Sequence, residues 1–129
     1  SKTVVLDGAH NVAKMTAFVD SFVHEYGDRK VPVLLALTKD KDFESMIPIL
    51  ARIASRLIVT TFTSSQDWPV EYIAPEKIIV SPGMAKITEV SSTWDAKKAF
   101  SELLATQGDL VVVTGSFYLI SDLKKNRLV

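Results

Sequence analysis

Residues 4 to 11, VVLDGAHN, decide the fold of this chain. The first three residues are an apolar run that suits a buried strand, and the next five supply a carboxylate, a tight turn, an imidazole and a carboxamide. The apolar spacing of residues 12 to 26 then predicts a helix that Asn11 caps and Gly27 ends. A buried strand that passes through a short polar turn into a helix is typical of parallel α/β proteins.

The rest of the chain repeats this alternation. Apolar runs predict further strands at residues 31–37, 56–62, 77–80 and 109–116, and periodic apolar residues predict helices at residues 43–54, 95–106 and 117–125. Within these, Asp42 is expected to cap the second helix, Pro48 to kink it or make it restart, and Gly108 to end the third. Residues 63–76 read as a polar loop, and residues 84–92 fit neither pattern. The sequence thus predicts one Rossmann-like α/β domain, with a mostly parallel open sheet of about five to six strands and helices on both faces.

Composition excludes several classes of protein. The 129 residues carry 15 basic and 15 acidic side chains, so the net charge is zero and a nucleic-acid partner is not expected. No apolar stretch approaches the roughly 20 residues that span a bilayer, so no membrane role is expected. The chain has no cysteine and two histidines, and it shows no phosphate-binding loop, GxGxxG, HExxH or nucleophile elbow. No metal site is therefore predicted.

Polar side chains follow three of the predicted strands. They occur in DGAHN (residues 7–11), TKDKD (residues 38–42) and TGS (residues 114–116). Ligands of open parallel sheets bind beyond the carboxyl ends of the strands, where helix N-termini favour anions. The residues alone therefore indicate an anion-binding α/β domain.

Each of these segments also has a purely structural interpretation. Asp7 and Gly8 can form a turn with Asn11 as a helix cap, and His10 can be a packed side chain. TKDKD can be a solvated loop with a cap, and TGS an ordinary strand-to-helix turn. His24, late in its helix, is read as a surface residue.

The motifs LDGAHN, LTKDKDFESMI and LVVVTGSFYLI occur in this order at three strand ends. Together they resemble the carboxyl-terminal domain of folylpolyglutamate synthase and dihydrofolate synthase, in the Mur ligase superfamily, over about residues 2 to 125. The chain has Val12 where that family usually has proline.

The resemblance implies ATP-dependent amide formation between a folate carboxylate and L-glutamate. It implies that residues 1–129 are the glutamate-binding domain of a longer cytoplasmic enzyme and are inactive alone. ATP and Mg²⁺ would bind mainly to the amino-terminal domain, which also takes folate or dihydropteroate, and this domain would close over the ATP.

The resemblance also assigns residues to the site, although it assigns none a certain catalytic role. His10 and Ser116 match glutamate-binding positions, and Asp7, with Asn11 beside it, matches a nucleotide-binding position. The supporting residues are Gly8, Lys39, Asp40 and Gly115. A ligase domain of this kind needs Asp7, His10 and Ser116 to converge on one cleft. The alternatives are a non-catalytic α/β binding or regulatory module and a Mur-type ligase for another amino acid.

Overall fold

The computed structural model describes residues 2–64, 67 and 69–129. Within these residues five strands form one sheet in the order β1-β5-β2-β3-β4, and all four neighbouring pairs are parallel. The strands are β1 (Thr3–Asp7), β2 (Val31–Leu35), β3 (Ala54–Val59), β4 (Glu89–Ser92) and β5 (Leu110–Thr114). The predicted α/β class and parallel sheet are confirmed.

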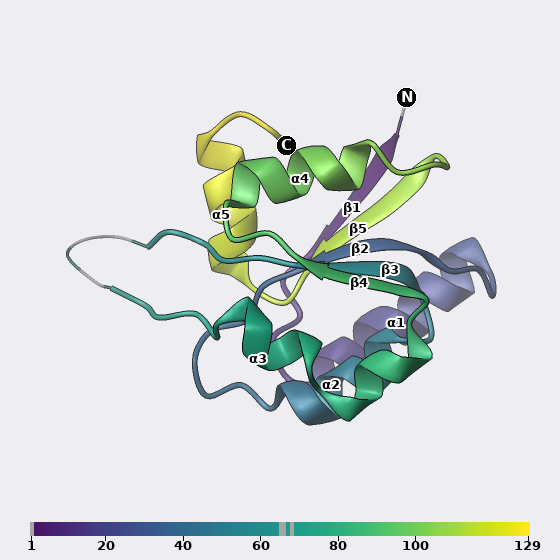
Figure 1. Cartoon of the computed structure of the whole chain (residues 1–129). Coiled ribbons are helices and arrows are strands. Elements are labelled where there is room, and N and C mark those ends of the chain that lie inside the picture. Colours follow the sequence, from purple (N-terminus) through teal and green to yellow (C-terminus); the bar gives the residue numbers. More distant parts are fainter. Residues whose placement is uncertain (1, 65–66, 68) are drawn as a thin grey trace.

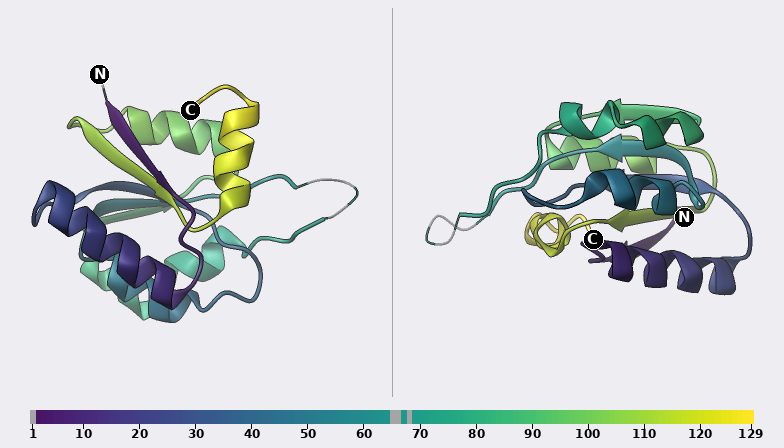
Figure 2. Two further views of the ribbon diagram at one scale, coloured as in Figure 1. Left: turned by 180° about the vertical axis from the view of Figure 1, so that it is seen from behind. Right: turned by 90° about the horizontal axis from the view of Figure 1, so that it is seen from below.

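Helices cover both faces of the sheet, as Figures 1 and 2 show. One face packs against α1 (Val12–Tyr26), α2 (Phe43–Leu50), α3 (Pro75–Ile79) and the 3₁₀ helix η1 (Pro82–Lys86). The other packs against α4 (Ala96–Leu104) and α5 (Phe117–Lys125). Strand β2 serves both layers, because Val33 and Leu35 join the first core while Leu34 joins the second. A strand buried on both faces must be apolar at successive positions, which explains the run at residues 31–37.

Local capping follows the sequence closely. The Asn11 side chain accepts a hydrogen bond from Lys14 N at 2.8 Å and begins α1, which ends at Gly27. Asp42 accepts from Ser45 N at 3.3 Å and caps α2. Both caps were predicted, and they occupy helix N–H groups that would otherwise have no partner.

One predicted strand is wrong, and one predicted helix is shorter than expected. Residues 77–80 do not form a strand, because Pro75 starts α3 there, with Ile78 buried against the core and Val80 77% exposed. The fourth strand is instead β4, within the stretch whose periodicity was ambiguous. The second helix neither restarts at Pro48 nor reaches residue 54, since α2 runs continuously to Leu50.

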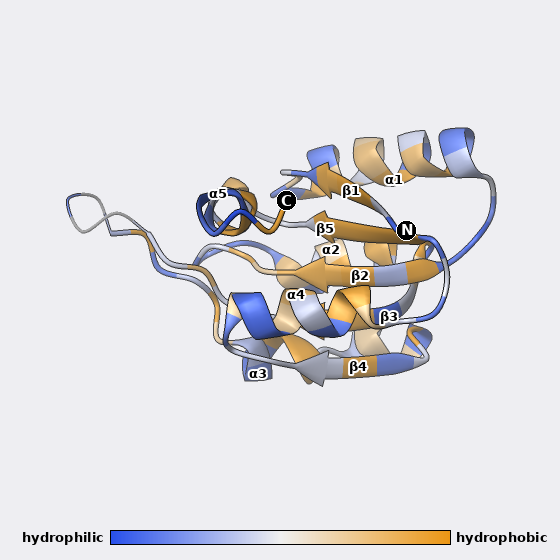
Figure 3. Ribbon diagram, turned by 90° about the horizontal axis from the view of Figure 1, so that it is seen from above, coloured by the Kyte–Doolittle hydropathy of each residue, from blue (hydrophilic) through white to orange (hydrophobic). Residues whose placement is uncertain are grey.

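The described residues between β3 and α3 extend beyond the carboxyl ends of the strands (Figure 3). This segment was predicted as a loop, and Ser65, Gln66 and Trp68 within it, like Ser1, lie outside the described residues. Its returning half pairs with the chain after β2 through an isolated antiparallel bridge between Thr38 and Tyr72. We call residues 69–74 the return segment. It forms one wall of the site described next.

Candidate functional site

The carboxyl ends of the parallel strands lie at one edge of the sheet, where Figure 3 shows the arrowheads pointing toward α5 and the projecting segment. An open cavity of about 690 Å³ lies at this edge. His10 follows β1, Lys39 follows β2 and Ser116 follows β5, so three separate turns supply its walls. The remaining lining residues are Thr38, Asp40, Lys41, Pro69, Val70, Glu71, Phe117 and Tyr118.

His10 is held by its own turn. Its Nδ1 lies 2.9 Å from the carbonyl oxygen of Gly8, and the ring is half-buried. A carbonyl oxygen only accepts, so Nδ1 carries the hydrogen in this contact. His10 can therefore donate a second hydrogen bond, from Nε2, only as the imidazolium cation.

Ser116 is buried and caps α5. Its Oγ accepts a hydrogen bond from Tyr118 N at 3.0 Å, and only 2% of the residue is exposed. Accepting this bond uses a lone pair of the hydroxyl and not its proton, which can still be donated to a ligand. Neither α1 nor α5 has an acidic residue in its first turn, so the positive ends of both helix dipoles are left uncompensated near the cavity.

Asp7 does not share this cavity, which corrects the predicted convergence of three side chains. It lines a separate hollow of about 370 Å³ together with Lys14 and Phe18 of α1. Val5 packs into the α1-side core and strand side chains alternate, so Asp7 points to the α1 face as well. Asp7 Oδ1 accepts a hydrogen bond from Ala9 N at 2.8 Å. Asp7 therefore forms an Asx-type turn, as the purely structural interpretation of DGAHN predicts.

The glycines that flank the site have steric roles. Gly115 has φ +101°, and a Cβ at this position would overlap the carbonyl oxygen of Ala36 and the side chain of Leu35. The turn from β5 to α5 therefore needs glycine to bring Ser116 against the end of β2. Gly8 supplies the carbonyl that holds His10.

Lys39 lines the cavity and forms an ion pair with Glu71. Its Nζ lies 2.8 Å from Glu71 Oε2, and its backbone N donates to the Glu71 carbonyl at 2.8 Å. The hydrogen bond and the charge of Glu71 raise the pKa of Lys39, and the same contact lowers the pKa of Glu71. Asp40 lies beside this pair with a left-handed backbone, φ 71°. Both groups are solvent-exposed, so the pair contributes little to stability.

Sequence reasoning missed Glu71 and two aromatic residues, Phe117 and Tyr118, that line the cavity. Two consecutive aromatic residues after a capping serine were a usable signal, because only one face of a helix start is buried. No local signal could place Glu71, since its position depends on the long-range bridge between Tyr72 and Thr38, in the chain after β2.

Within the described ranges, no group of three or more histidine, cysteine or acidic residues could hold a metal ion. No described helix combines the length and the apolar character that a membrane span requires.

The family model of the dihydrofolate synthetase C-terminal domain matches residues 1–126. The chain belongs to this family. It is 27% identical over 124 residues to dihydrofolate synthase/folylpolyglutamate synthase of Bacillus subtilis, covering 95% of this chain and 27% of the relative. It is also 27% identical over 125 residues to the dihydrofolate synthetase of Saccharomyces cerevisiae, covering 93% and 29%. The chain thus spans less than a third of the relatives' length.

Solved structures of folylpolyglutamate synthases share the fold. The Mycobacterium tuberculosis enzyme complexed with ADP and AMPPCP aligns with a TM-score of 0.78 at 21% identity, over 98% of this chain and 29% of that one. The Thermotoga maritima enzyme aligns with a TM-score of 0.77 at 22% identity, over 96% and 27%. The resemblance identified from three motifs is confirmed, and the family consists of ATP-dependent ligases.

Proposed function

We propose that this dihydrofolate synthetase C-terminal domain binds L-glutamate for an ATP-dependent ligase that joins it to the carboxylate of a folate or dihydropteroate. The observation that carries the proposal is that His10 and Ser116, from turns far apart in the chain, line one cavity. The Ser116 hydroxyl has a proton to donate, the Nε2 of His10 can donate as the imidazolium, and each side chain has a second contact that holds it in place.

This pair suits a carboxylate. The imidazolium Nε2–H of His10 and the Ser116 hydroxyl can donate two hydrogen bonds to its oxygens, and bonds to an ionised group are the stronger ones. The first turn of α5 adds a positive partial charge, because it is the N-terminus of a helix and contains no acidic residue. Holding glutamate by its carboxylate would orient its amino group toward the reacting carbonyl, and this supplies catalysis by proximity.

Lys39 and Lys41 bring two cations to the same cavity, and Asp40 and Glu71 bring two carboxylates. A zwitterionic amino acid with a second carboxylate needs both kinds of partner. Lys39 is already charged and oriented by Glu71, so it supports the second carboxylate, while Asp40 can accept from the amino group.

The nucleotide would lie mainly outside this chain. In the complete enzyme, ATP with Mg²⁺ would supply the phosphoryl group that activates the folate carboxylate. This domain would contact the nucleotide through the hollow that Asp7 lines. Asp7 Oδ1 already accepts a hydrogen bond from Ala9 N, and the second carboxylate oxygen can accept one from a ribose hydroxyl. Asn11 supports that role only indirectly, because its side chain caps α1.

NMR titration of the 14.2 kDa chain tests this function directly. L-glutamate should shift the resonances of His10, Ser116 and Lys39, whereas L-glutamine, which lacks the second carboxylate, should shift them only at much higher concentration. Equal responses to the two amino acids would refute recognition of the second carboxylate, and no response at these residues would refute glutamate binding. The isolated chain should not hydrolyse ATP, and robust hydrolysis would also contradict the proposal.

A ligase for another amino acid is the second candidate. The chain is 30% identical over 117 residues to a UDP-N-acetylmuramyl-tripeptide synthetase of Lacticaseibacillus paracasei, covering 87% of this chain and 22% of that protein. The same titration with L-lysine and L-alanine distinguishes this candidate, and a non-catalytic module would respond to no amino acid.

A further inference from the structure

Phe117, the first residue of α5, is an aromatic side chain that is 63% exposed at the edge of the cavity. Its ring nevertheless packs against a defined part of the backbone, at Gly8. A Cβ built on Gly8 would overlap the Cε1, Cδ1 and Cζ atoms of the ring, so the ring rests on the bare Cα of that glycine. A Cβ at position 8 would therefore force the ring to leave this position.

The same ring contacts His10. The two ring centroids are 6.0 Å apart with an interplanar angle of 57°, a tilted arrangement within the usual range of aromatic pairs. Gly8 thus contacts both rings. Its carbonyl oxygen accepts a hydrogen bond from the imidazole Nδ1, and its Cα packs against the phenyl ring of Phe117. A single hydrogen bond at Nδ1 still allows the imidazole to tilt, and the phenyl ring restricts that motion.

Phe117 also lines both hollows of the site. It contributes to the cavity that contains His10 and Ser116, and to the hollow that contains Asp7. The ring forms a wall that the two hollows share. It lies between the residues around His10 and the residues around Asp7.

We propose that Phe117 is the positioning residue of His10: seated on Gly8, its ring fixes the imidazole at the edge of the glutamate cavity and separates that cavity from the Asp7 hollow. The inference rests on the proposed function for its effect on glutamate, but not for its effect on the orientation of His10. Phe117 donates no hydrogen bond and acts only through its neighbour. A side chain that must be immobilised on binding weakens affinity, so loss of the ring should raise the Kd for L-glutamate about three- to tenfold.

NMR of the isotope-labelled chain tests this with two separate readouts. The first is the set of NOEs from the His10 ring protons to the Gly8 turn, which reports the orientation of the imidazole without a ligand and, unlike a chemical shift, is not altered by loss of the Phe117 ring current alone. The second is the Kd for L-glutamate. Phe117→Ala should change these His10 NOEs and raise the Kd. Phe117→Leu, which keeps an apolar group on Gly8, should hold the Kd within about twofold of the parent. Val80→Ala, which truncates an exposed apolar residue outside the site, should change neither.

Gly8→Ala provides an independent test, because its Cβ displaces the ring without removing it. It should raise the Kd as Phe117→Ala does, and the double variant should be no worse than Phe117→Ala alone. His10 NOEs and a Kd that are unchanged in Phe117→Ala would overturn the inference, as would fully additive effects of the two substitutions. If the parent chain does not bind L-glutamate, the proposed function fails, and the His10 NOEs still decide whether Phe117 orients the imidazole.

Discussion

Replacing His10 by alanine should separate glutamate binding from folding. The substitution removes the Nε2–H that we expect to donate to a carboxylate, and a hydrogen bond to a charged group is worth about 1.5–3 kcal/mol. The Kd for L-glutamate should therefore rise about 10- to 150-fold.

The effect of His10→Ala on stability should be small by comparison. The chain loses one hydrogen bond, from Nδ1 to the Gly8 carbonyl at 2.9 Å, worth about 0.5–1.5 kcal/mol. Unfolding entropy of ~2.1 cal/mol/K per residue over 129 residues converts this loss into a Tm decrease of about 2–6 °C.

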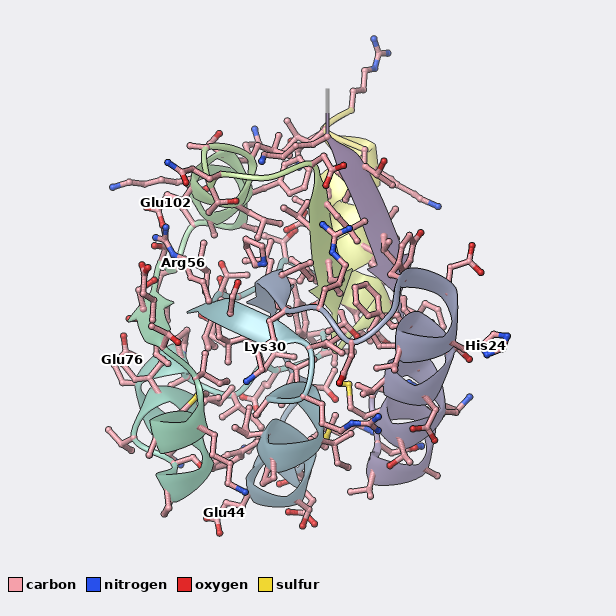
Figure 4. All side chains as sticks on the ribbon, turned by 90° about the vertical axis from the view of Figure 1, so that its right-hand side faces the viewer. His24, Lys30, Glu44, Arg56, Glu76 and Glu102 are labelled. Atoms are coloured by element: carbon pink, nitrogen blue, oxygen red, sulfur yellow. The ribbon has the colours of Figure 1, made fainter. Side chains whose placement is uncertain are left out.

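Calorimetry gives both quantities, by titration for the Kd and by scanning for the Tm. His24→Ala is the matched control, because His24 is exposed near the end of α1 and points away from the domain (Figure 4). It should leave the Kd unchanged. A Tm loss with an unchanged Kd would show that His10 is only a packed side chain.

Three further predictions concern the framework of the site. Gly115→Ala should lower the free energy of unfolding by at least ~1–3 kcal/mol in urea denaturation, since its φ is +101° and a Cβ has no room; wild-type stability would refute the steric argument. Leu103→Ala should cost about 2–5 kcal/mol because Leu103 is fully buried, while Leu104→Ala on the same helix, 39% exposed, should cost under ~1 kcal/mol; equal costs would contradict the packing of α4. Glu71→Gln should cause a small, salt-sensitive loss of stability at neutral pH, where both partners are charged. The lowered pKa of Glu71 means that this difference disappears as the pH falls through that pKa, and the raised pKa of Lys39 means that it also disappears at strongly alkaline pH; a difference that persists in acid would exclude the ion pair as its cause.

The sequence predicted the framework where local rules decide it. Helices α1 and α5 have the predicted bounds because Asn11 and Ser116 are efficient caps followed by apolar periodicity. The central strands were recognisable because burial on both faces leaves runs with almost no polar residue. The predicted strands were longer than β2, β3 and β5, since apolar residues such as Leu37 stay buried after the strand pairing ends.

The errors arose where tertiary context overrides composition. KIIV reads as a strand by its β-branched residues, yet Pro75 begins a helix there and Val80 faces solvent. Edge strand β4, EVSS, has too few apolar residues to be recognised. In the site, the sequence indicated which turns meet but not which way each side chain points, so Asp7 was placed with His10 and Ser116 although it belongs to the neighbouring hollow.

A crystal structure of this chain with L-glutamate is the most direct test of the proposed site. We predict a glutamate carboxylate within about 2.7–3.2 Å of both His10 Nε2 and Ser116 Oγ, with Phe117 still seated on Gly8. Glutamate bound in the Asp7 hollow, or bound without contact to His10 and Ser116, would contradict the central claim that these two turns form the amino-acid site.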